Sequence, residues 1–151
     1  MTASGMTRVV CGIALPMFFI VATAAQDDVA RLVQKRKETM KSIAEATKNI
    51  SVRIRSKRDL AKIKPDAEQV QALAAKVVAL FPPGSDQHPT TEAKPAIWTN
   101  WSDFEARFRA LETESAKLAK ADFRKPDAVA AQYHTFHQLC LDCHELYRVK
   151  K

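Results

Sequence analysis

The sequence feature that most restricts the fold is a regular apolar repeat in the second half of the chain. Between residues 97 and 118, seven positions recur at alternating intervals of four and three: Ile97, Trp101, Phe104, Phe108, Leu111, Ser115 and Leu118. This period places all seven on one face of an α-helix and is typical of the seam of a helical bundle. We therefore expect a helix over residues 96–121 that packs against other helices.

Three further segments repeat with a helical period. The first, over residues 27–50, carries Val29, Leu32 or Val33, Arg36, Met40, Ile43, Thr47 and Ile50 on one face. The second starts at Pro65 and has its stripe at Val70, Leu73, Val77 and Leu80. The third, over residues 126–149, has its inner face at Val129, Tyr133, Phe136, Cys140, Cys143 and Tyr147. Spacings of three and four put each set on one side of a helix.

The segments between these helices are polar, and the chain as a whole is poor in signals for β-structure. Residues 51–64 are basic and are expected to form a loose connection with a helical turn, and four of the seven prolines fall within 82–95, which indicates a surface loop. After residue 25 only one glycine remains, Gly84, and β-branched residues do not alternate. An all-α, antiparallel up-down four-helix bundle is the simplest fold for this pattern.

The first 25 residues are typical of a cleaved secretory signal. Arg8 supplies the positive start, residues 9–22 are apolar, and small residues follow at 22–25. The run is short for a membrane span, which needs about 20 apolar residues. The sequence predicts a signal over residues 1–25, a bundle domain over residues 26–151, a periplasmic location and no stable membrane span after cleavage.

The charge of the chain is uneven. The formal net charge is +7, and removing the signal takes away only Arg8 among the charged residues. Residues 31–64 contain twelve Lys and Arg residues but only three acidic residues, Glu38, Glu45 and Asp59. Such a face is either simply solvated or attracts an acidic protein or an anionic lipid surface. Nucleic acid is not expected, because the protein is exported and no stacking aromatic residues interleave with these charges.

The sequence Cys140-Leu141-Asp142-Cys143-His144 has the C-x-x-C-H spacing of c-type haem attachment. Two thiols one helical turn apart form thioethers with the porphyrin, and the adjacent histidine supplies an axial nitrogen. A redox dithiol would need a βαβ context, which is not visible. A helical zinc module would recruit His134 or His137, but structural zinc needs a second pair of ligands at a matching spacing, and residues 26–151 contain no other cysteine.

Several residues outside this pentad also point to a haem. Arg36 and Met40 lie one turn apart on the apolar face of the first helix, where a buried arginine needs a counter-charge such as a haem propionate. Arg148 lies one turn after His144 and reaches either a propionate or the surroundings of that histidine. His137 faces the same side of its helix and is either a haem-edge residue or an ordinary helix histidine. The aromatic residues near position 100 are either plain core or the wall of a large flat cofactor.

The mature chain resembles cytochrome c′ and cytochrome c-556, the class II c-type cytochromes. The resemblance rests on the C-terminal C-x-x-C-H followed by ELYR, RKETMKSI in the first helix, ALFPPGSD closing the second and AIWTNWSDFEA opening the third. Two positions depart from the family pattern: His137 replaces a frequent glycine, and Leu141 replaces a small or basic residue.

The resemblance implies a periplasmic four-helix bundle with one covalently bound haem c. Cys140 and Cys143 would form the thioethers, His144 would be the proximal ligand, and Arg36 and Arg148 would match the family's two haem-side arginines. Met40 would face the iron on the distal side, so His144 and Met40 are the candidate metal ligands.

Two functions follow, and the first is favoured because a flexible thioether that faces the iron has an obvious bond to make. With Met40 bound to iron, the protein is a low-spin electron carrier whose redox partner is an acidic protein. With an open distal site, it is a high-spin protein that binds NO or CO. A non-haem zinc module is a third alternative. Enzymatic catalysis is not expected, because no nucleophile pairs with a base and no two carboxylates share a site. The protein is expected to be a monomer or a homodimer. The resemblance implies a dimer through the first two helices, whereas like charge on the first helix opposes self-association and makes a monomer a real alternative.

Overall fold

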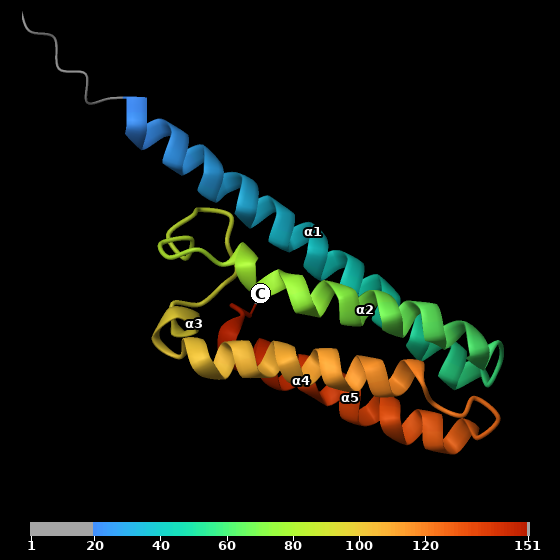
Figure 1. Ribbon diagram of the computed structural model, residues 1–151. Coiled ribbons are helices and arrows are strands. Elements are labelled where there is room, and N and C mark those ends of the chain that lie inside the picture. The colour runs from blue at the N-terminus through green and yellow to red at the C-terminus, as the bar shows by residue number, and fades with distance from the viewer. Residues whose placement is uncertain (1–19, 151) are drawn as a thin grey trace, which may run out of the picture.

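The structure, a computed structural model, describes residues 20–150, with side chains from residue 26 onward. Four helices form an antiparallel up-down bundle (Figure 1): α1 (Ile20–Ser56), α2 (Ile63–Val77), α4 (Trp101–Ala119) and α5 (Pro126–Tyr147). The short helices are η1 (Leu60–Lys62), η2 (Val78–Leu80) and α3 (Ala96–Thr99). Within the described residues, β-pairing is limited to one isolated bridge between Ala93 and Arg148. The predicted all-α bundle is therefore confirmed.

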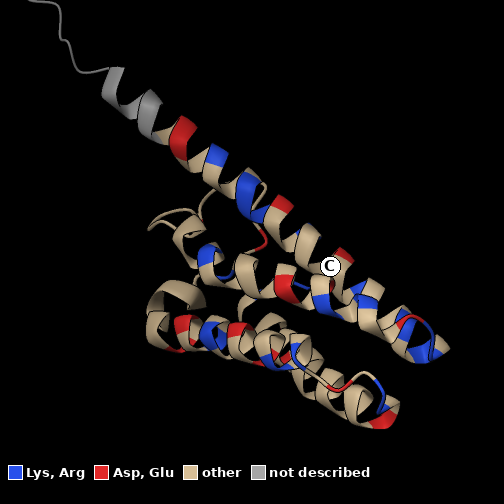
Figure 2. Cartoon of the chain, turned by 45° about the vertical axis from the view of Figure 1, so that its right-hand side comes forward, with Lys and Arg blue, Asp and Glu red and all other residues tan. Residues whose placement is uncertain are grey.

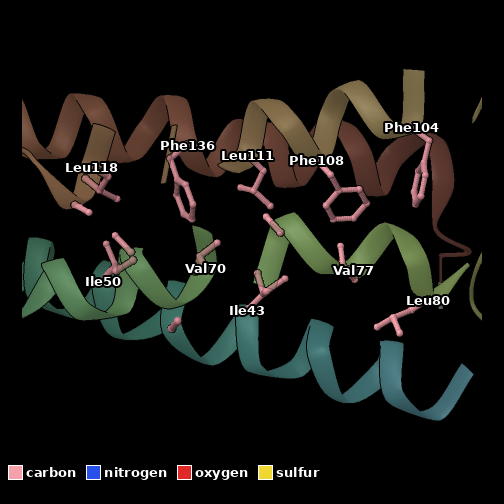
Figure 3. Packing of buried hydrophobic residues seen from close by; sticks show 14 of the residues in the cluster. Ile43, Ile50, Val70, Val77, Leu80, Phe104, Phe108, Leu111, Leu118 and Phe136 are labelled. Carbon is pink, nitrogen blue, oxygen red and sulfur yellow. The ribbon is translucent and has the colours of Figure 1, made fainter. Parts of the chain in front are cut away.

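The core is built by the faces that the periodicity predicts. Buried residues from all four long helices meet in one cluster that includes Ile43, Ile50, Val70, Val77, Phe104, Phe108, Leu111, Leu118 and Phe136. Figure 3 shows these side chains directed from opposite helices toward a shared interior. Of the seven seam positions in residues 97–118, only Trp101 is partly exposed. Packing of these stripes, rather than helix propensity alone, supplies most of the stability of such helices.

The first connection is shorter than the sequence predicts. Residues 51–56 continue α1 instead of opening a loop, and α2 begins at Ile63, two residues before Pro65. Ile54 packs against the core, and Arg53 forms an ion pair with Asp66 of α2. The turn is then closed at Lys57 and Asp59, both with positive φ angles. The loose connection with a helical turn that was expected over residues 51–64 is therefore wrong for residues 51–56 and is limited to residues 57–62, which include η1.

The third predicted helix is interrupted near its start. Residues 96–99 form α3, Asn100 leaves the helical region with φ −126° and ψ 42°, and α4 begins at Trp101. The Asn100 side-chain amide donates to the Ala96 carbonyl at 3.0 Å, which satisfies the end of α3. The helix also ends at Ala119 rather than residue 121, and α5 ends at Tyr147 rather than residue 149.

Packing between neighbouring helices is uneven. The pairs α1–α2, α2–α4 and α4–α5 make close contact, whereas α1 and α5 approach each other less. At the N-terminal end, α1 projects beyond the rest of the bundle (Figure 1). The expected signal cleavage site falls at the beginning of α1, and residues 1–19 of that expected signal lie outside the described residues. Within residues 20–150, no helix is both long enough and apolar enough to cross a bilayer.

Candidate haem site

A cavity of about 680 Å³ lies among α1, α4, α5 and the loop that follows η2. This volume falls within the range of about 300–1,000 Å³ that is common for ligand and cofactor sites. Its α4 wall is formed by Phe104, Arg107, Phe108 and Leu111, and its α5 wall includes Tyr133 and Tyr147. Phe104 and Phe108 therefore belong both to the core and to the cavity wall. Trp98 and Trp101 pack against the core but do not line the cavity.

The α5 wall carries the C-x-x-C-H pentad. Cys140 and Cys143 are half-buried free thiols and both line the cavity. Burial raises the pKa of each thiol to about 11. Thiols in this environment are protonated at neutral pH, whereas redox dithiols depend on a lowered pKa. The environment of the two cysteines therefore does not favour a reactive dithiol.

His144 is an exposed residue of the same wall. It lies beside an ion pair that joins Arg148, just after α5, to Glu92 in the loop before α3. Arg148 contacts Glu92 through both Nε and Nη2 at 2.9 Å. The pKa of His144 is lowered, first by desolvation and second by the positive charge of Arg148, while Glu92 opposes the shift. The lowered pKa favours the neutral imidazole, which is the form that binds metals.

The region around Arg148 is tied to the loop before α3 by backbone pairing. The Lys94 amide donates to the Tyr147 carbonyl at 2.9 Å, and the Val149 amide donates to the Glu92 carbonyl at 2.8 Å. Lys94 Nζ also donates to the Glu145 carbonyl at 2.9 Å. These bonds fix the end of α5, and with it His144, against the loop.

The α1 wall carries Arg36 and Met40. Arg36 is only 4% exposed, and burial lowers its pKa. Its Nη1 donates to the Ser85 hydroxyl at 2.9 Å, and its Nη2 donates to the Ser85 carbonyl at 3.3 Å and to the Thr91 hydroxyl. The guanidinium also lies 4.6 Å from the centre of the Phe81 ring. All of these acceptors are neutral, so the site retains the positive charge of Arg36 for an anion.

A second polar network at the site is centred on Asp103 of α4. Asp103 accepts a hydrogen bond from Arg107 Nε at 2.7 Å and another from the Tyr147 hydroxyl at 2.5 Å. The hydrogen bond from Arg107, followed by that from Tyr147, holds the pKa of Asp103 below its usual value. Arg107 lines the cavity next to Cys143, so this network fixes the α4 and α5 walls relative to each other.

The structure brings the six predicted site residues together at one cavity. These residues are Arg36, Met40, Cys140, Cys143, His144 and Arg148. His137 also lines the cavity and stacks on the Tyr133 ring, with the two ring centres 5.5 Å apart. His88 and His134 do not line it. His88 is half-buried in its loop, where its Nδ1 accepts a hydrogen bond from the Thr90 amide at 3.3 Å.

Four residues near the site escaped the sequence analysis: Ser85, Thr91, Glu92 and Arg107. Three of them lie in or near the proline-rich loop that was expected to be surface, yet Ser85 is fully buried. Their partners are 49 to 56 residues distant along the chain, so no local pattern indicates these contacts. The sequence holds only a weak sign of the role of Arg107, namely its position one turn after Asp103 on a helix with an aromatic face.

These features fit a haem held by covalent bonds. The cavity has two thiols and a histidine directly after them on α5 and a buried cation on α1, and much of its remaining wall is apolar or aromatic. A buried guanidinium with neutral acceptors suits a carboxylate such as a propionate. By contrast, among residues 26–150 no three His, Cys, Asp or Glu side chains gather in a way that would hold a metal ion directly.

The fold and site define a class of protein: a helical bundle that binds haem c. A family model described as cytochrome c′ matches residues 31–148. The chain belongs to the cytochrome c′ family, and its cofactor is haem c, bound covalently through two thioethers.

Individual relatives agree with this assignment. The chain is 30% identical over 129 residues to cytochrome c′ of Rhodopseudomonas palustris, which covers 84% of this chain and 86% of the relative. It is 28% identical over 121 residues to cytochrome c-556 of Agrobacterium tumefaciens, covering 79% and 98%. A solved nitric oxide complex of a cytochrome c prime variant from Alcaligenes xylosoxidans superposes with a TM-score of 0.70 at 26% identity, covering 81% and 97%.

Proposed function

We propose that the protein is a periplasmic electron carrier whose haem iron has His144 and Met40 as axial ligands. The observation that carries this proposal is that Met40 on α1 and His144 on α5 line one cavity from two different helices. Met40 is also the only methionine after the expected signal, since the other three are at positions 1, 6 and 17. Haem iron supplies one-electron chemistry, and a methionine ligand raises its reduction potential.

The other site residues would hold and orient the cofactor. Cys140 and Cys143 would form the two thioethers, which anchor the group to α5. Arg36 would offer its buried positive charge to a propionate, while Ser85 and Thr91 keep its guanidinium oriented. Arg148 is engaged by Glu92 beside His144, so we assign it to the proximal surroundings rather than to a propionate.

Replacing Met40 with leucine tests the proposed ligand. Leucine has a similar volume and no sulfur, so Met40→Leu conserves packing at a cost below about 1.5 kcal/mol. The purified ferric protein should be low-spin and show a sulfur-to-iron charge-transfer band, and Met40→Leu should be high-spin. Leu139→Met, which changes another half-buried residue of the cavity wall, is the matched control and should leave the spectrum unaltered. A high-spin spectrum in the original protein, unchanged in Met40→Leu, would contradict ligation by Met40.

A second candidate function is binding of NO or CO at an open distal site. It is favoured by the solved nitric oxide complex of the related cytochrome c prime variant, and by the apolar residues that line the cavity with Met40, which include Ile43 and Phe81. In this case Met40 packs without bonding, as methionine commonly does in cores. Rapid CO binding by the reduced protein, equal in the original and in Met40→Leu, would establish this candidate.

The predicted signal over residues 1–25 supports export to the periplasm. Cell fractionation and the mass of the mature N-terminus test both the location and the cleavage site.

The charge of α1 favours a monomer over a homodimer through this helix, and analytical ultracentrifugation at low and high salt tests that expectation. Dimerisation that strengthens at low salt would contradict the charge argument.

A further inference from the structure

The rim of the haem cavity carries a large excess of positive charge. The basic side chains that line the cavity are Arg36, Lys37, Lys41, Lys48, Arg55, Arg107 and Arg148. Of these, Arg36 is buried in the wall and Arg107 is paired with Asp103, so the net positive charge of the rim comes from Lys37, Lys41, Lys48 and Arg55. The only carboxylate among the lining residues is Glu92, and it is already paired with Arg148. Charge of one sign around a hollow site focuses the electric field there and raises the local concentration of oppositely charged partners.

Four of these cations form a stripe along α1. Lys37, Lys41, Lys48 and Arg55 are spaced by four, seven and seven residues, so they share one face of the helix over about 27 Å. All four are exposed while lining the cavity, and the blue segments of Figure 2 show that Lys and Arg residues recur along this helix. Lys41 approaches Glu45 only at 4.0 Å, with both side chains more than 60% exposed. Such pairs are worth little, so the stripe retains its charge.

Two exposed apolar side chains also line the cavity. Leu141 of α5 lines the cavity although it is 48% exposed, and Ala44 lies exposed on α1 between Lys41 and Lys48. A small apolar centre surrounded by charged residues is the usual anatomy of a transient protein–protein interface. Leu141 and Ala44 offer too little apolar area to anchor the protein in a lipid bilayer, because membrane-bound helices bury a whole face of large apolar residues.

We propose that this basic rim, formed by Lys37, Lys41, Lys48 and Arg55 around Ala44 and Leu141, is the docking surface for an acidic electron-transfer protein. The partner would present carboxylates to the α1 stripe and an apolar spot to Leu141. This inference rests on the proposed electron-carrier function and adds the place and chemistry of the partner. Electrostatic complementarity of this kind increases the association rate more than it increases affinity.

The experiment compares two variants of the full holoprotein with equal changes in net charge. The rim variant is Lys41→Glu with Lys48→Glu. The control variant is Lys76→Glu with Lys120→Glu, two exposed lysines outside the cavity lining. Stopped-flow spectroscopy follows haem reduction by reduced flavodoxin, an acidic flavoprotein, at low ionic strength. Each rate constant is divided by that measured with a small uncharged quinol, which removes differences in the haem itself.

The rim variant should lose about tenfold or more in the normalised rate constant, and the control less than about threefold, since steering contributes about 10- to 1,000-fold. The loss should disappear in high salt. Equal losses in both variants, or no loss in either, would overturn the proposal. Vesicles of phosphatidylglycerol and phosphatidylcholine provide another arm. If the protein binds these vesicles, the rim variant alone loses that binding and flavodoxin reduces all variants at the same rate, the occupant of the rim is a membrane surface. This outcome would also overturn the proposal.

Failure of the proposed function would be visible separately. If Met40 is not a ligand, the spin state of the original protein shows it without any partner. The ratio between the rim and control variants still reports where an acidic protein docks, because it depends on charge near the cavity and not on the sixth ligand.

Discussion

Arg36 and Ser85 join α1 to the loop after η2, and a double-mutant cycle on this pair is the most direct test of how the α1 wall is held. Arg36 is 4% exposed, Ser85 is fully buried, and the Arg36 Nη1 to Ser85 Oγ distance is 2.9 Å. A hydrogen bond to a charged group contributes about 1.5–3 kcal/mol. Ser85→Ala should therefore lower the free energy of unfolding by an amount in that range.

The second single variant, Arg36→Met, changes the free energy of unfolding through several contributions. Arg36→Met leaves the Ser85 hydroxyl without its donor, at a cost of about 1–3 kcal/mol. It also removes the contact with the Phe81 ring, worth about 0.5–2 kcal/mol. Loss of a desolvated cation offsets part of this cost. Because each single change removes the same hydrogen bond, the double variant should cost less than the two single costs added together, with a coupling of about 1–2 kcal/mol.

Urea denaturation of the holoprotein, followed by circular dichroism, measures all four corners of the cycle. Arg36→Met combined with Ser102→Ala, an exposed serine of α4, is the control and should be additive within about 0.5 kcal/mol. The same additivity for Arg36 with Ser85 would refute our account of this wall. The reduction potential gives a second readout: removing a buried positive charge beside the haem should lower it, because that charge favours the ferrous state.

Three further predictions concern the scaffold. Phe136→Ala should lower the free energy of unfolding by about 3–5 kcal/mol in urea denaturation, since this side chain is fully buried. Hydrogen bonds from Arg124 hold the pKa of Asp122 at about 2, below its ordinary 3.8, so the stability from this pair is present above pH 3.8 and is lost toward pH 2. Asp122→Asn should therefore flatten that part of the acid unfolding curve, and NMR titration of Asp122 should give the midpoint of its protonation. Lys57→Gly should raise the melting temperature, because Lys57 has φ 51° and any residue other than glycine costs about 1 kcal/mol in this left-handed conformation. The control Lys62→Gly, at φ −75°, should lower the melting temperature.

The bundle could be predicted because its information is local. A stripe such as the one at Phe104, Phe108 and Leu111 depends only on spacing within one helix, and the structure buries it as expected. The pentad is local in the same sense, which is why the cysteines and His144 were found. Arg36 and Met40 were found because a charged or flexible residue stood out on an otherwise apolar face.

The errors arose where distant contacts decide the local structure. Residues 51–56 are polar enough to suggest a loop, but Ile54 reaches the core and Arg53 pairs with Asp66 only after α2 has folded back. Ser85 lies in a segment rich in proline, yet Arg36 draws it into the interior. Asn100 was visible in the sequence, but whether an asparagine continues a helix or caps one depends on the chain around it.

The backbone pairing between residues 92–94 and 147–149 has a consequence for the order of folding. It closes a chain segment of more than 50 residues with only a few hydrogen bonds, so the entropy cost of closing this loop is repaid only after α4 and α5 have packed together. Contacts of this kind form late and open first. The last turn of α5, which carries His144, is therefore expected to exchange its amide hydrogens sooner than the buried middle of the same helix, although both belong to one continuous element.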